Sequence, residues 1–112
     1  MKIATWNINS VRLRIHHVLR FIKEQNIDVM CLQETKTQDE FFPSDDFKKV
    51  GFKYQFYKGE KSYNGVAILS NEKFLDTNYI NWCQKGDTRH LSVKIKNDIK
   101  VTIKKYFLPF ID

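Results

Sequence analysis

Two polar residues near the ends of predicted strands are of types that bind a divalent cation. Asn7 lies near the end of a strand predicted over 2–8, and Glu34 follows the predicted strand 28–33. Ligands of α/β sheets bind beyond the carboxyl ends of the strands. A single carboxylate with neighbouring amides suits Mg²⁺, which keeps several waters and needs only one or two protein carboxylates plus substrate phosphate. The simpler interpretations are that Asn7 only ends a strand and that Glu34 belongs to a solvated loop.

A second group of residues has the chemistry to contact nucleic acid. Arg89 can hold a phosphate with two parallel hydrogen bonds, and Tyr63 can stack on a sugar or a base. Turn formation alone explains the dipeptide Asn64-Gly65 that follows Tyr63. Lysines also alternate along a predicted hairpin, where a solvated strand face is the alternative to a binding surface. They are Lys94, Lys96, Lys100 and Lys104.

Length, charge and apolar content limit the classes of protein that this chain can be. Its 112 residues correspond to one ordinary domain, and its formal charge of +6 favours polyanionic partners. Apolar runs are of strand length, which excludes a membrane span, and the first residues do not resemble a signal peptide. Two cysteines, Cys31 and Cys83, are too few for a disulfide scaffold or a zinc site. We therefore expect a cytoplasmic protein with reduced thiols.

Several other catalytic patterns are missing from the sequence. There is no Gly-rich phosphate loop, no Cys–His pair and no Gly-x-Ser-x-Gly elbow. His16 and His17 are adjacent on a predicted helix and point in different directions, which is typical of solvated histidines rather than of a metal site. The metal and nucleic-acid interpretations are therefore the ones to carry forward.

Hydrophobic periodicity predicts the elements that position these residues. Apolar side chains at helical spacing predict a helix over 11–25, with Ser10 as its N-cap and Asn26 as its end. The run over 28–33 predicts a strand buried on both faces. Alternation on both sides of Asn97-Asp98 predicts a hairpin over 91–103. The remaining predictions are a short helix from Ser44 to Gly51 and strands over 53–57, 66–70 and 79–82. This order indicates an α/β or α+β fold with a mixed sheet.

Three segments together resemble a known family. Met1-Lys2-Ile3-Ala4-Thr5-Trp6-Asn7-Ile8-Asn9-Ser10-Val11-Arg12 resembles the opening of bacterial exonuclease III. The segment 28–36, which ends in Gln33-Glu34-Thr35-Lys36, resembles the second motif of that family, and the segment 62–70 resembles the third. These enzymes belong to the endonuclease/exonuclease/phosphatase superfamily. The similarity in residue identity, order and spacing runs from residue 1 to about residue 101, and residues 102–112 diverge.

The resemblance implies a fold, an activity and a set of site residues. The fold would be an α/β sandwich of two packed sheets, and the activity would be cleavage of duplex DNA at abasic sites and 3′ ends with Mg²⁺ or Mn²⁺. Glu34 would bind the metal, Asn7 would line the same site, and Asn9 and Lys36 would support it. Positions that contact the DNA backbone in this family are matched by Arg12, Tyr63 and Arg89.

The resemblance also implies that part of the catalytic machinery lies outside this sequence. Family members are more than twice as long, and their later motifs include the general base. Their Gly-Asp-x-Asn and Ser-Asp-His motifs have no match here, and Tyr106-Phe107-Leu108-Pro109-Phe110 differs from their Tyr-x-Pro-Asn motif by one extra residue and the missing Asn. We therefore expect residues 1–112 to be the N-terminal part of a truncated domain that is inactive alone. Its partners would be duplex DNA and, if it is not a monomer, a separate C-terminal fragment. The alternatives are a residual DNA-binding module and a phosphatase that acts on small phosphoesters. We also expect the inner face of one sheet to be uncovered and strand edges to be unpaired.

Overall fold

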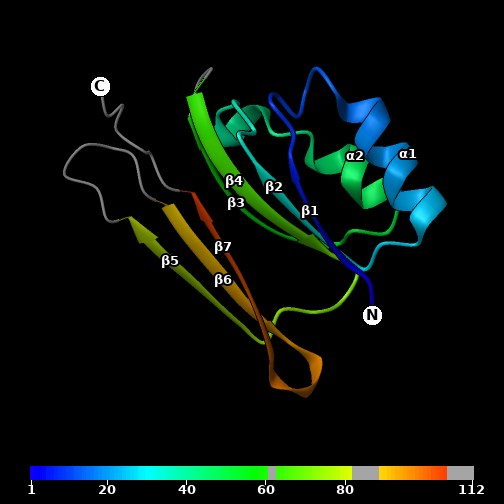
Figure 1. The fold of residues 1–112 in the computed structure, drawn as a ribbon, viewed down its shortest axis with the longest axis vertical. Helices are drawn as coiled ribbons and strands as arrows, with labels where there is room; N and C mark the ends of the chain where they lie inside the picture. The colour runs from blue at the N-terminus through cyan, green and yellow to red at the C-terminus, as the bar shows by residue number, and fades with distance from the viewer. Residues whose placement is uncertain (61–62, 82–88, 106–112) are drawn as a thin grey trace, which may run out of the picture.

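Two β-sheets pack face to face, and helices cover the outer face of one of them (Figure 1). The computed structural model describes residues 1–60, 63–81 and 89–105. In chain order its elements are β1 (Ile3–Asn7), α1 (Ile15–Gln25), β2 (Val29–Gln33), η1 (Asp39–Phe41), α2 (Ser44–Lys49), β3 (Tyr54–Glu60), β4 (Tyr63–Ser70), β5 (Asp76–Asn81), β6 (Arg89–Ile95), η2 (Lys96–Asp98) and β7 (Ile99–Lys105).

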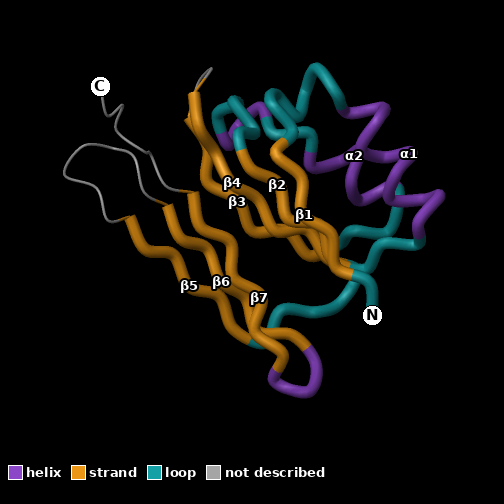
Figure 2. Tube along the Cα trace, in the orientation of Figure 1, coloured by secondary structure: helices purple, strands orange, loops and turns teal. Residues whose placement is uncertain are grey.

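The four-stranded sheet is mixed, as the sequence predicted. Its strand order is β1-β2-β4-β3, with β1 parallel to β2 and the other neighbours antiparallel (Figure 2). The β1–β2 pair is parallel because α1 carries the chain back along the sheet between them. The second sheet is antiparallel, with the order β5-β6-β7. The α/β class and the two-sheet architecture are therefore confirmed.

Helix α1 is shorter than its apolar pattern predicted. It begins at Ile15 rather than at Val11, and Ser10 does not cap it. Ser10 instead has a left-handed backbone with φ of 83°, and its Oγ accepts the N–H of Leu13 at 3.4 Å. Residues 11–14 form a turn rather than a helix, although the apolar spacing that predicted the helix includes Val11. The predicted end of the helix is confirmed, because Asn26 is left-handed and donates its N–H to the carbonyl of Ile22.

Strand β2 is buried on both faces, and it separates two apolar cores. Met30 and Leu32 pack toward the helices, together with Val18 and Ile22 of α1. The alternate residues pack toward the three-stranded sheet. This second core joins Val29 and Cys31 of β2 and Val66 and Ile68 of β4 to Leu91, Val93, Ile95, Val101 and Ile103 of the hairpin. Each face of β2 is apolar because each is covered.

The hairpin has the predicted turn but longer strands. Asn97 and Asp98 have φ of 60° and 57°, a conformation that Asn and Asp tolerate well. Strands β3 and β4 also extend beyond their predicted limits, and β5 begins at Asp76 rather than at Tyr79. Because β5 is an edge strand whose first residues are mostly exposed and polar, pairing with β6 defines it and apolar alternation does not. Trp82 lies outside the described residues.

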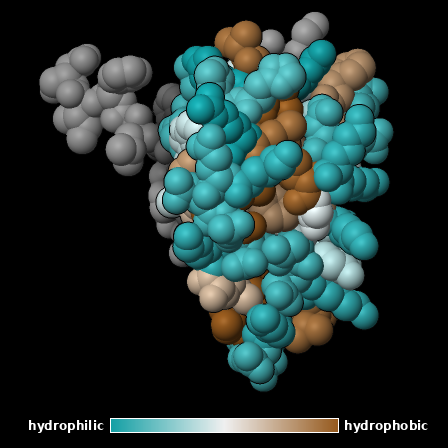
Figure 3. All heavy atoms as spheres, turned by 90° about the vertical axis from the view of Figure 1, so that its right-hand side faces the viewer, coloured by the Kyte–Doolittle hydropathy of each residue, from teal (hydrophilic) through white to brown (hydrophobic). Residues whose placement is uncertain are grey.

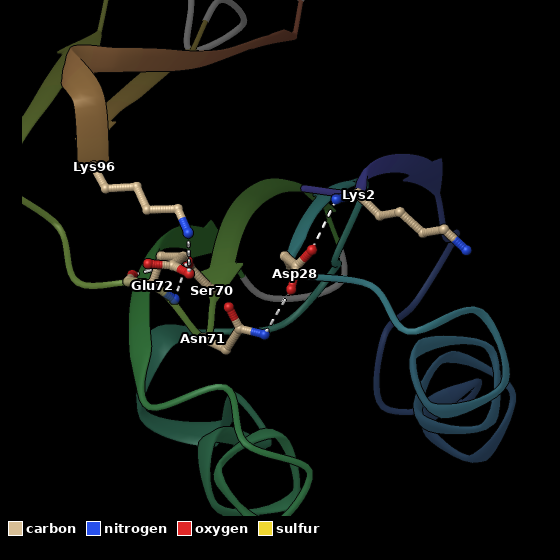
Figure 4. Close-up of polar contacts among 6 residues, drawn as sticks. All are labelled: Lys2, Asp28, Ser70, Asn71, Glu72 and Lys96. Atoms are coloured by element: carbon tan, nitrogen blue, oxygen red, sulfur yellow. Dashed lines mark hydrogen bonds and ion pairs between the residues drawn. The ribbon is translucent and has the colours of Figure 1, made fainter.

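Polar contacts join the elements at the amino ends of β1 and β2 (Figure 4). Asp28 accepts the backbone N–H of Lys2 at 2.8 Å and the side-chain amide of Asn71 at 3.1 Å. These two hydrogen bonds hold the pKa of Asp28 below its usual value. Lys96 of the hairpin forms an ion pair with Glu72 at 3.1 Å, which connects the two sheets at this end. In the part of the chain that the structure describes, no helix is long and apolar enough to span a membrane.

Candidate metal centre at the carboxyl ends of β1 and β2

The parallel register brings the two predicted metal-site residues to one edge of the sheet. Asn7 pairs with Gln33, and the next backbone N–H, from Ile8, donates to the carbonyl of Gln33 at 3.0 Å. Glu34 follows Gln33 directly and is half-buried. The predicted placement of Glu34 beside the end of β1 is therefore confirmed. Its role as a metal ligand stays a prediction.

Backbone hydrogen bonds tie three separate segments together around Glu34. The N–H groups of Ser10 and Val11 donate to the carbonyls of Glu34 and Thr35, at 2.9 and 3.1 Å. On the other side, Thr35 N–H donates to the carbonyl of Gly65 at 3.2 Å, and Lys36 N–H donates to that of Asn64 at 2.7 Å. The loop after β2 is therefore clamped between the loop after β1 and the start of β4. Such clamping restricts the positions that the Glu34 backbone can adopt.

Left-handed backbone conformations are concentrated in these same three segments. The φ angles are positive at Asn9 (48°), Ser10 (83°), Glu34 (54°), Lys36 (52°) and Asn64 (48°). For Ser10, Glu34 and Lys36 this conformation costs about 1–2 kcal/mol each, whereas Asn tolerates it better. Backbone strain of this kind persists where the surroundings enforce it, and it concentrates at functional sites.

Lys36 and Asn9 contact each other across the site. The Nζ of Lys36 donates to the Oδ1 of Asn9 at 2.6 Å. The sequence placed both residues near Glu34 as supporting groups, and the structure brings them into direct contact. A positive charge is thereby held between the loops that follow β1 and β2.

Gly65 allows the closest approach within the site. Its φ is +99°, and a Cβ at this position would overlap the hydroxyl of Thr35. Thr35 is only 1% exposed, and sequence reasoning did not single it out. The signal was present, because a glycine near the start of a strand, here Gly65 after Asn64, marks a place where two backbones can approach closely. The Nδ2 of Asn64 is also buried, and it has no hydrogen-bond partner among the residues that the structure describes.

The predicted DNA-contacting residues are spread around this edge. The guanidinium of Arg12 lies over the ring of Phe41, 5.7 Å from its centroid, so its packing is directed toward η1. Tyr63 and Arg89 begin β4 and β6, whose first residues lie at the same end of the sandwich as the carboxyl end of β1 (Figure 1). The side chains of Tyr63 and Arg89 lie outside the described part of the structure.

The ligand chemistry fits a hard cation rather than zinc. Within the described ranges, no three residues of the types His, Cys, Asp and Glu are grouped so that they could hold a metal. One carboxylate with amide oxygens, completed by water and phosphate, matches Mg²⁺ or Mn²⁺. Cys31 is not a candidate ligand, because burial raises its pKa to about 11 and keeps the thiol protonated. A cavity of about 180 Å³ lies apart from this edge, on the three-stranded sheet, where Asp76, Ser92, Lys94 and Lys100 line it.

Known sequences and structures agree with this architecture. The profile of the Endonuclease/Exonuclease/phosphatase family matches residues 4–108. Exodeoxyribonuclease III of Haemophilus influenzae is 37% identical over 73 residues, which are 65% of this chain and 27% of that protein. Exodeoxyribonuclease of Bacillus subtilis is 31% identical over 110 residues, which are 92% of this chain and 42% of that protein.

Two solved structures share the fold over nearly the whole chain. An AP endonuclease from Archaeoglobus fulgidus has a TM-score of 0.78 and 36% identity, over 91% of this chain and 40% of the other. The 3′ phosphatase NExo from Neisseria, bound to a product DNA hairpin, has a TM-score of 0.80 and 27% identity over the same shares. This chain therefore spans less than half the length of each of these four proteins.

Proposed function

Because the chain belongs to the Endonuclease/Exonuclease/phosphatase family, we propose that it is the part of an exonuclease III-type nuclease that binds the metal and the DNA backbone. The substrate would be duplex DNA with abasic sites or 3′ ends, and the reaction would be phosphodiester hydrolysis. The observation that carries this proposal is the clamped, strained edge where Glu34, Asn7, Asn9 and Lys36 gather.

Glu34 and Asn7 would hold the cation. When bound, Mg²⁺ or Mn²⁺ would polarise the scissile phosphate and neutralise the charge that develops on it. Glu34 supplies the single protein carboxylate, and the backbone bonds to its loop orient it. Lys36, through its bond to Asn9, keeps a positive charge at the same edge, which favours an approaching phosphate.

Binding of the DNA backbone would come from Arg12, Tyr63 and Arg89. Arg12 is exposed and is held over Phe41 by a cation–π contact, so ordering it on a phosphate costs little additional entropy. The formal charge of +6 adds a non-specific attraction that weakens with salt. This attraction also supports the second candidate, a DNA-binding module without catalysis.

We propose that the chain by itself is nearly inactive. General-base and metal assistance act jointly in such reactions, so losing either group removes most of the rate. Among the described residues, no three of the types His, Cys, Asp and Glu are grouped so that they could hold a metal.

The decisive experiment measures Mn²⁺ binding by electron paramagnetic resonance, with and without a DNA duplex that contains an abasic site. We expect Glu34→Gln to weaken Mn²⁺ binding at least tenfold, because it removes the single carboxylate ligand. Glu24→Gln is the matched control, because Glu24 lies on the exposed face of α1, where its side chain pairs with Arg20. Equal Mn²⁺ affinity in both variants would contradict the metal site. Salt-dependent DNA binding without any Mn²⁺ binding would favour the non-catalytic module.

A further inference from the structure

Two neighbouring phenylalanines between β2 and α2 have opposite environments. Phe42 is buried, and its ring stacks on the rings of Tyr57 and Phe47 at centroid distances of 4.0 and 5.7 Å. Phe41, the last residue of η1, is 54% exposed. Because Phe42 anchors the segment in the core, the residue before it is held at the surface.

Other contacts fix η1 against the end of β3. The Oδ1 of Asp39 accepts the backbone N–H of Gly59 at 2.7 Å. A Cβ at Gly59 would overlap the carbonyl oxygen of Thr37, so the two backbones approach each other closely here. Within η1, the N–H of Phe41 donates to the carbonyl of Gln38 at 3.0 Å. An exposed aromatic side chain on such a fixed segment loses little conformational freedom when it binds a ligand.

Arg12 places a positive charge on this exposed ring. The carbon of its guanidinium lies 5.7 Å from the centroid of the Phe41 ring. Within the described ranges the ion pairs join other side chains, so no carboxylate there uses the N–H groups of Arg12. The two residues before Arg12 donate their backbone N–H groups to the loop that contains Glu34. The Arg12–Phe41 pair is therefore held beside the candidate metal centre.

The pair lies at the end of the molecule where the loops after β1 and β2 meet, which is the upper end in Figure 1. Figure 3, which views the molecule from the side of α1 and α2, shows apolar surface among hydrophilic side chains at this upper end. A ligand that fits here must therefore offer both an anionic group and an apolar face.

An arginine on an exposed aromatic ring combines two modes of nucleic-acid recognition. The guanidinium can bind a phosphate with two hydrogen bonds, and the ring can stack on a base. Of the acidic residues of η1, Asp39 is bonded to Gly59 and Glu40 is exposed, so η1 itself offers stacking rather than charge. A base in an intact duplex is already stacked on its neighbours, and moving it out of the stack costs free energy. An unpaired base does not carry this cost.

Resting on the proposed function, we propose that Phe41 stacks on an unpaired nucleotide of the DNA, next to the phosphate that Arg12 would bind. The chain would then prefer a duplex with a single-stranded 3′ tail to the same duplex fully paired. Phe41 would be a specificity-determining residue, because it favours one form of DNA and adds nothing to the attraction that all DNA shares.

DNA binding by the full chain at low salt tests this preference through the fluorescence anisotropy of labelled tailed and paired duplexes. Phe41→Ala should weaken binding of the tailed duplex about tenfold and that of the paired duplex less than about twofold. Phe41→Trp should restore the preference, because it keeps an aromatic face. The matched control is Leu75→Ala, which should change neither affinity. Leu75 is 56% exposed and directly precedes β5, which begins at the opposite end of the molecule (Figure 1).

A second measurement locates the contact directly. A tail that carries 5-iodouracil is irradiated in the complex, and the cross-linked peptide is identified by mass spectrometry. We expect the cross-link at Phe41 with the tailed duplex, and none there when the same base is paired. A residue that only positions Arg12 would not produce this difference.

Three results would overturn the inference. One is an equal loss of affinity for both duplexes in Phe41→Ala, which would mean that the ring only positions Arg12. The second is a cross-link at another residue with no effect of Phe41→Ala, which would leave the ring for a protein partner. The third is that the tailed duplex does not bind at all. If Phe41 shows the preference but Glu34→Gln leaves Mn²⁺ binding unchanged, only the proposed metal site fails. If Mn²⁺ and DNA bind as proposed but Phe41→Ala behaves like Leu75→Ala, only this inference fails.

Discussion

The ammonium group of Lys36 donates a hydrogen bond to the side-chain oxygen of Asn9 at 2.6 Å, joining the loops that follow β1 and β2. Both residues have left-handed backbones, so the contact connects two strained loops. It is the side-chain counterpart of the backbone bonds from Ser10 and Val11 to the loop that contains Glu34.

This contact should be measurable as a coupling free energy. In a double-mutant cycle with Asn9→Ala and Lys36→Met, we expect a coupling of about 0.5–1 kcal/mol in the free energy of unfolding by urea. The control is the exposed pair Asp45 and Lys48, 4.0 Å apart on α2, for which about 0.3 kcal/mol is expected. Equal couplings for the two pairs would mean that the Lys36 bond adds nothing beyond an ordinary surface interaction.

Backbone strain at Glu34 predicts an unusual order of stability. Both Glu34→Gly and Glu34→Ala remove the side chain, but only alanine keeps a Cβ at φ of 54°. We therefore expect the glycine variant to be more stable by roughly 0.5–1 kcal/mol, judged by thermal unfolding. At Lys23 within α1, alanine should instead be more stable by about 1 kcal/mol. The same order at both positions would show that Glu34 is not strained.

Gly65→Ala should be more destabilising than Gly51→Ala. Both glycines have positive φ, so alanine costs about 1–2 kcal/mol at either position. Only at Gly65 would the new Cβ also overlap Thr35, whereas nothing lies within 4 Å at Gly51. Overpacking adds about 1–3 kcal/mol at Gly65, which chemical denaturation should resolve. Similar losses in both variants would mean that the Thr35 loop moves aside easily.

Acid should weaken the fold partly through Asp28. Because its pKa is lowered in the folded state, its contribution is present above the unfolded value of 3.8 and is lost as pH falls through the folded value. Asp28→Asn should cost about 1 kcal/mol at neutral pH and should flatten the loss of stability between about pH 5 and pH 2. Asp45→Asn is the control, since its side chain is 92% exposed. An unchanged acid profile for Asp28→Asn would contradict this assignment.

Cys31 should resist alkylation until the protein unfolds. Its pKa of about 11 and its burial in the inter-sheet core suppress both the thiolate and access to it. In a Cys83→Ser variant, which leaves Cys31 as the single thiol, reaction with iodoacetamide at neutral pH should be more than about 100-fold slower than for an unfolded thiol. Addition of urea should restore the full rate. Rapid alkylation of the folded variant would indicate that the two sheets separate readily.

Local sequence patterns predicted the type and approximate position of most helices and strands correctly. Four consecutive apolar residues predicted the doubly buried strand β2, and Asn97-Asp98 predicted the hairpin turn. The predicted start of α1 was wrong. Val11 has the spacing of a helical residue, but its N–H donates to the carbonyl of Thr35 in a distant loop. A residue whose backbone bonds to a distant loop cannot be distinguished from a helical one by periodicity alone.

By itself, the sequence determined the order and type of the elements, the Asn7 and Glu34 positions at strand ends, and the motifs that resemble exonuclease III. The tertiary structure alone decided which residues meet. The parallel pairing of β1 with β2 brings Lys36 to Asn9, and backbone hydrogen bonds from Thr35 and Lys36 to the start of β4 clamp the Glu34 loop. The reach of the three-stranded sheet leaves Ile3 uncovered. The physical reason is that propensity and periodicity act between near neighbours, whereas these contacts depend on how whole strands pair and how far one sheet extends over the other.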